Sequence, residues 1–150
     1  MNSGKKALRL AGGISTIVVS SILLMGAFMV LALIDGLQSL AAGDAVAEAA
    51  VNVLRITTLF LLIFSLAAIV LAALLCANKK PKIMAIILAV LMAGLAILEF
   101  VGSGNNGEGE VNTVAIVYGV ICLIITAVLV AYLFVKDKPA ISQANENINN

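Results

Sequence analysis

The chain has 150 residues, of which 63% are hydrophobic and only 11% are charged, and its formal net charge is +1. Soluble domains average about 45–50% apolar and about 25% charged residues, so this chain has too few polar side chains to cover a surface in water. Its mean hydropathy of +1.17 indicates an integral membrane protein instead.

Four apolar runs follow one another along the chain, and each can cross a hydrocarbon core of about 30 Å as a helix. Apolar residues surround each helix rather than forming one stripe, which argues against a segment lying on the membrane surface. The shorter alternating segments of β-barrels do not occur, so we predict an all-α membrane four-helix bundle. The predicted spans are residues 11–34, 56–77, 83–101 and 113–135, within a single transmembrane domain of residues 1–137.

The first span follows a charged start that is also typical of a signal peptide. A signal peptide has an apolar core of about 7–15 residues. The run from Ala11 to Ile34 is much longer and matches a membrane span. We therefore expect this first helix to be retained.

An alanine-rich segment, residues 36–52, separates the first two spans. Within it, Asp44 is placed to cap a short helix that begins at Ala45. Glu48 adds a favourable negative charge to the first turn of that helix.

The later connections differ in character. Residues 78–82 form a tight basic turn, whose Pro81 suits the first turn of the third helix. Residues 102–112 are rich in glycine and asparagine, which predicts a flexible, solvated loop. Residues 138–150 are polar without a hydrophobic face, so we expect a disordered cytoplasmic tail.

The charges predict the orientation of the chain. All basic residues except Arg55 fall on one side of the predicted spans, and positive charge near span ends marks the cytoplasm. Both termini are therefore expected inside, and the other side carries the acidic residues Asp35, Asp44, Glu48, Glu99, Glu108 and Glu110. The basic residues expected to contact lipid headgroups are Lys5, Lys6, Arg9, Lys79, Lys80 and Lys82.

The second and fourth spans share a sequence frame. Each begins with Val-Asn, at residues 51–52 and 111–112, and each ends in lysines followed by proline, at residues 79–81 and 136–139. One interpretation is an internal duplication that gives two helical hairpins in parallel orientation. The other is that spans ending at a cytoplasmic face independently acquire lysines and a helix breaker.

Three charged residues are predicted to lie near the same outer interface: Asp35 ends the first span, Arg55 opens the second and Glu99 is near the end of the third. Arg55 is expected to pair with either carboxylate, which would satisfy a charge that lipid penalises. This cluster is either a cation or ligand site in an external vestibule, or an interfacial staple with snorkelling side chains. We favour the staple.

Small residues recur four apart in the predicted helices, most clearly as Ala85, Ala89 and Ala93 in the third span. This spacing lets helices approach closely. We expect most such stripes to pack within the bundle, while one serves an oligomer or a partner.

The residue inventory does not support catalysis or cofactor binding. Histidine is absent, which removes the usual general base and the commonest metal ligand. Cys76 and Cys122 lie at depths about 15 Å apart, too far for a disulfide, and match no metal-binding pattern. No phosphate-binding glycine motif occurs. Nucleic-acid binding is not indicated, because the basic clusters are short and adjacent to the membrane.

The stretch from Leu66 to Leu98, LAAIVLAALLCANKKPKIMAIILAVLMAGLAIL, and the N-terminal KKALRLAGGIST together resemble small bacterial four-span membrane proteins of unknown function. The resemblance rests on composition and the KKPK turn. It implies a bacterial plasma membrane, and it implies no known activity or site residues.

The sequence thus predicts a non-enzymatic membrane interaction or accessory protein, either a homo-oligomer or a subunit of a larger membrane complex, without cofactors. The alternative function is a small oligomeric pore or holin-like permeabilising protein. An enzymatic function survives only if Asp35 and Glu99 recruit a metal.

Overall fold

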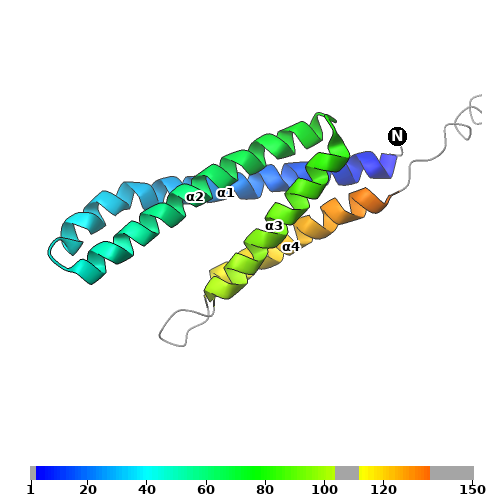
Figure 1. The fold of residues 1–150 in the computed structure, drawn as a ribbon. Helices are drawn as coiled ribbons and strands as arrows, with labels where there is room; N and C mark the ends of the chain where they lie inside the picture. The colour runs from blue at the N-terminus through cyan, green and yellow to red at the C-terminus, as the bar shows by residue number, and fades with distance from the viewer. Residues whose placement is uncertain (1–2, 104–111, 136–150) are drawn as a thin grey trace, which may run out of the picture.

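The computed structural model describes residues 3–103 and 112–135, and this part of the chain is helical throughout apart from its turns. Each of its four helices is long and apolar enough to cross a membrane, which confirms the all-α prediction. The predicted loop tip at 104–111 and tail at 138–150 lie outside the described residues. The helices in Figure 1 are α1 (Ser3–Ala41), α2 (Ala45–Cys76), α3 (Pro81–Ser103) and α4 (Thr113–Phe134).

The first two helices are much longer than the last two. α1 has 39 residues and α2 has 32, whereas α3 has 23 and α4 has 22. At 1.5 Å per residue these lengths correspond to about 58 and 48 Å against about 33–35 Å. The α1–α2 hairpin therefore exceeds a hydrocarbon core of about 30 Å and reaches past the α3–α4 hairpin (Figure 1).

The predicted cap at Asp44 is confirmed, but the helix that follows it is not short. The Asp44 carboxylate accepts hydrogen bonds from the backbone N–H groups of Val46, at 2.9 Å, and Ala47, at 3.3 Å. α2 then continues without a break to Cys76. The alanine-rich segment contains strong helix formers and no proline, so nothing separates it from the second span.

The turn between α2 and α3 is closed by a Schellman motif. Asn78 takes the left-handed conformation, with φ at 61°. Its N–H donates to the carbonyl of Leu75, and the N–H of Lys79 donates to the carbonyl of Leu74, both at 3.1 Å. Pro81 then begins α3, as predicted from its fixed φ.

The helices pack as two hairpins that meet at one end. α1 packs mainly along α2 and α3 mainly along α4, with smaller interfaces between α1 and α4 and between α2 and α3. Figure 1 shows the hairpins close together near the N-terminus and diverging away from it. We call the end that holds Ser3, the α2–α3 turn and Phe134 the basic end, and the opposite end the acidic end.

Two consecutive glycines in α1 allow close contact with α2 and with α4. A Cβ atom at Gly12 would lie 2.8 Å from Leu129 Cδ2 of α4. A Cβ atom at Gly13 would collide with the Cys76 sulfur of α2 and lie 3.3 Å from the Ala72 carbonyl oxygen. Within one turn, therefore, the backbone of α1 approaches both of its neighbours.

One further contact joins the two hairpins, and another packs α3 against α4 within the second hairpin. The Tyr118 hydroxyl of α4 donates a hydrogen bond of 3.3 Å to the Val19 carbonyl of α1. In the second hairpin the Phe100 ring covers Gly119, where a Cβ atom would lie 3.0 Å from the ring. The buried core draws on all four helices and includes Val19, Ala68, Ala72, Leu75, Leu88, Met92, Cys122, Ile125 and Leu129.

We expect the Gly13→Val substitution to lower the free energy of unfolding by about 1–3 kcal/mol, because the added methyl groups would separate α1 from α2. The measurement is thermal or denaturant unfolding in detergent micelles. Gly94→Val is the matched control, since Gly94 is exposed and a Cβ there would meet nothing within 4 Å. Equal stability of the two variants would contradict the close contact at Gly13.

Candidate functional site

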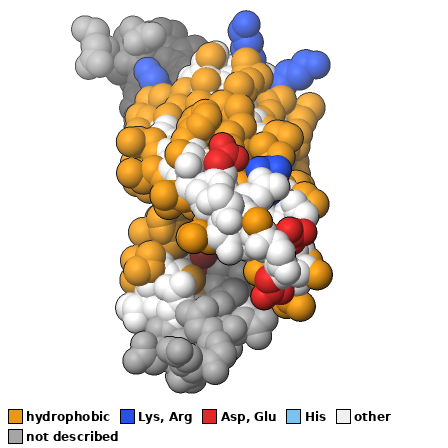
Figure 2. Space-filling view, turned by 90° about the vertical axis from the view of Figure 1, so that its left-hand side faces the viewer, with side chains coloured by type: hydrophobic (Ala, Val, Ile, Leu, Met, Phe, Trp, Pro, Cys, Tyr) orange, Lys and Arg blue, Asp and Glu red, His pale blue; other side chains and the backbone are white. Residues whose placement is uncertain are grey.

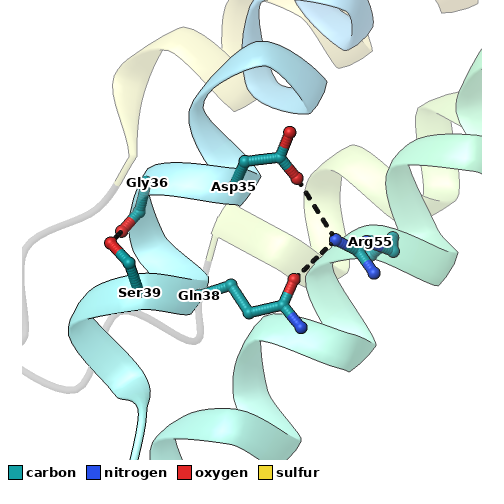
Figure 3. A network of polar contacts seen from close by, with 5 residues as sticks. All are labelled: Asp35, Gly36, Gln38, Ser39 and Arg55. Atoms are coloured by element: carbon teal, nitrogen blue, oxygen red, sulfur yellow. Dashed lines mark hydrogen bonds and ion pairs between the residues drawn. The ribbon is translucent and has the colours of Figure 1, made fainter.

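A polar network joins α1 and α2 toward the acidic end (Figure 3). Arg55 Nη2 donates to Gln38 Oε1 at 2.7 Å and lies 3.4 Å from Asp35 Oδ1. Asp35 and Gln38 are three residues apart and so share one face of α1, opposite Arg55 on the antiparallel α2. The predicted pairing of Arg55 with Asp35 is therefore present, with Gln38 as an additional partner.

The network is open to its surroundings. The side chain of Arg55 is 38% exposed and that of Asp35 is 89% exposed. Ion pairs this exposed typically contribute about 0–1 kcal/mol. The nearby Ser39 hydroxyl donates to the Gly36 carbonyl of its own helix at 2.7 Å, so it does not extend the network toward a ligand.

Glu99 is not part of this network. It lies half-buried on α3, in the other hairpin, and the ion pair described for Arg55 is with Asp35. The three residues predicted to gather at one interface are thus divided between the two hairpins. Within residues 3–103 and 112–135, no group of three or more His, Cys, Asp or Glu side chains is placed to hold a metal ion.

Gln38 was missed by sequence reasoning, although a signal for it exists. An amide three residues after Asp35 lies on the same helix face and is long enough to reach an arginine on an adjacent helix. At 2.7 Å its bond to Arg55 is shorter than the contact with Asp35. The nearer partner of Arg55 is therefore an uncharged residue, which a pattern of charged residues does not reveal.

The predicted alanine stripe of α3 lies mostly within the protein. Ala85 and Ala89 are buried and belong to the central core, whereas Ala93 is half-buried. Close helix contacts also occur at glycines, namely Gly12, Gly13 and Gly119. In the sequence, Gly12 and Gly13 appear only as a pair of adjacent glycines near the start of the first span.

The predicted headgroup-binding residues separate into two groups. Lys6, Lys79, Lys80 and Lys82 are exposed at the basic end, where headgroup contact stays a prediction. Lys5 and Arg9 are buried, at 4% and 5% exposure, and headgroup contact stays a prediction for them as well. They lie one turn apart on the side of α1 that also holds the buried Thr16, so their side chains meet protein rather than solvent.

The Arg55 network has the chemistry of a structural tie between α1 and α2. It offers a guanidinium already bound to an amide and a carboxylate, without a nucleophile beside a base. When the chain is compared with protein-family models, curated proteins and solved structures, nothing matches.

We expect Arg55→Gln to lower the free energy of unfolding by no more than about 1 kcal/mol, because both charged partners are exposed. Chemical unfolding in micelles measures this. Lys82→Gln, which removes the same charge at the basic end, provides the control. A loss of more than about 3 kcal/mol at Arg55 alone would contradict the staple interpretation, because it would require a strongly desolvated pair.

Proposed function

We propose that the chain is a non-enzymatic interaction protein of the bacterial plasma membrane, with both termini in the cytoplasm, that joins an oligomer or a larger membrane complex. The observation that carries this proposal is an unpartnered face of α1. Its members recur at alternating intervals of four and three residues and run toward the acidic end. This docking face consists of Ile22, Gly26, Met29, Leu33, Gly36 and Leu40.

The docking face is exposed along its length. The four large side chains, Ile22, Met29, Leu33 and Leu40, are between 54% and 85% exposed. A Cβ atom at Gly26 or Gly36 would meet nothing within 4 Å. The face is therefore not occupied by another part of the described chain.

Both glycines line concave surfaces. Gly26 borders a pocket of about 270 Å³ that also includes Tyr118, and Gly36 borders one of about 490 Å³ between Leu33 and Leu40. In a membrane, an apolar side chain gains little free energy when it exchanges contact with lipid for contact with another helix. Helix association therefore depends on close packing, which small residues permit. The alternating spacing fits a partner helix crossing at a small angle.

The charge distribution supports the proposed orientation. Figure 2 views the molecule from the acidic end, where acidic side chains gather over the tip of the long hairpin and hydrophobic side chains surround it. The exposed lysines lie at the basic end. An excess of Lys and Arg marks cytoplasmic ends of spans, so the long hairpin would present its tip outside the cytoplasm.

We expect the Gly26→Leu/Gly36→Leu double variant to lose self-association or partner binding, because the new side chains would fill both concave surfaces. Co-purification in mild detergent, with molar mass measured by light scattering, tests this. Gly94→Leu is the control, since it fills an exposed glycine on α3. A wild-type protein that is only a monodisperse monomer without a partner would contradict the proposal.

We further expect purified protein in liposomes to release no ion or dye at a high protein-to-lipid ratio. The buried hydroxyls of Thr16, Thr58 and Ser65 donate to carbonyls of their own helices. The buried Ser20 hydroxyl has no partner among the described residues, but a single hydroxyl does not form a continuous polar path. Rapid leakage that depends on protein concentration would instead favour the pore or holin-like alternative.

A further inference from the structure

Two cations are buried side by side at the basic end. Lys5 and Arg9 lie one turn apart on α1, and 4% and 5% of their respective surfaces remain exposed. The Lys5 ammonium lies 5.7 Å from the centre of the Tyr132 ring of α4. Arg9 Nη1 donates a hydrogen bond to Asn78 Oδ1 in the α2–α3 turn. The site therefore draws on α1, α4 and the turn.

Arg9 is the residue whose bonding is incomplete. Its Nε is fully buried, and within the described part of the chain it has no hydrogen-bond acceptor. Asn78 offers a neutral amide, which holds the guanidinium but does not balance its charge. A buried charge or donor without a partner is costly in free energy.

The described carboxylates are too far along the helices to balance Arg9. In residues 3–103 and 112–135 these are Asp35, Asp44, Glu48 and Glu99. On α1, Asp35 lies about 39 Å from Arg9 at 1.5 Å per residue. The others belong to the acidic end. The neighbouring charges in the described part are instead basic, and they include the exposed Lys6, Lys79 and Lys80.

This combination favours one class of ligand. A guanidinium presents its N–H donors in a planar fork that matches a phosphate group, often through two parallel bonds. Basic pockets between helices at the cytoplasmic side of a membrane bind anionic headgroups. A multiply charged oxyanion would supply an acceptor for Nε and a negative charge beside Arg9.

We propose that the basic end binds a phosphate group, with Arg9 as its principal ligand and Asn78 as the residue that positions the guanidinium. Asn78 is suited to this, because its left-handed conformation is fixed by the Schellman motif of α2. The phosphate belongs either to an anionic phospholipid headgroup or to soluble phosphate. The proposal does not depend on the docking face, which lies on another part of α1.

The test follows the thermal unfolding midpoint of the full chain in a neutral detergent. One arm adds phosphatidylglycerol, with phosphatidylcholine as its reference. The other adds inorganic phosphate, with sodium chloride at equal ionic strength as its reference. Ligand that binds the folded state raises the midpoint. A rise with phosphatidylglycerol alone identifies a headgroup site, and a rise with inorganic phosphate identifies a site for soluble phosphate.

Three variants assign the effect to this site. Arg9→Gln should weaken the apparent affinity by roughly tenfold or more, because it removes charge-assisted hydrogen bonds. Lys6→Gln removes the same charge from an exposed neighbour and should leave the affinity nearly unchanged. Asn78→Asp supplies an internal carboxylate, so it should raise the midpoint without ligand and abolish the response. That variant keeps the test decisive if Arg9→Gln does not fold.

Several outcomes would overturn the proposal. One is the absence of any midpoint shift for the wild type in both arms. Another is an equal loss of affinity in Lys6→Gln and Arg9→Gln, which would indicate diffuse attraction to basic charge. A third is an Asn78→Asp variant that responds to ligand as the wild type does.

Discussion

The close approach of α1 to both α2 and α4 at Gly12 and Gly13 is the contact on which the remaining architecture depends. Hydrogen atoms in place of side chains let the Leu129 and Cys76 side chains rest against the α1 backbone. The two hairpins are thereby joined near the basic end. Beyond the bond from Tyr118 to Val19, the two hairpins diverge toward the acidic end (Figure 1).

This uneven packing gives the two ends different chemistry. At the basic end the helices are close enough to bury Lys5 and Arg9, and the backbone turn at Asn78 contributes a polar partner. At the acidic end Arg55 and Asp35 remain accessible, and a Cβ atom at either glycine of the docking face would meet nothing within 4 Å. The proposed phosphate site thus lies where the helices converge, and the proposed docking face runs toward the end where they diverge.

Much of the fold followed from the sequence because long apolar runs leave few alternatives in lipid. The Asp44 cap, the start of α3 at Pro81 and the Arg55–Asp35 pair follow from local rules of helix capping and charge pairing. The continuity of α2 did not follow from the sequence, because an alanine-rich segment is equally compatible with a short separate helix outside the membrane and with an extension of the span. Counting charges gives the side of the membrane but not the direction of a side chain, so the burial of Arg9 could not be predicted.

The most direct test of this account is a pair of distances measured by double electron–electron resonance in lipid bilayers. Spin labels at Lys6 and Phe134 report the separation of α1 and α4 at the basic end, and labels at Met25 and Val114 report it at a comparable depth toward the acidic end. Both native cysteines are replaced by alanine. Divergent hairpins predict a clearly longer distance for Met25 and Val114. Equal distances would show that α1 and α4 keep the same separation along their length, and would contradict the divergence of the hairpins.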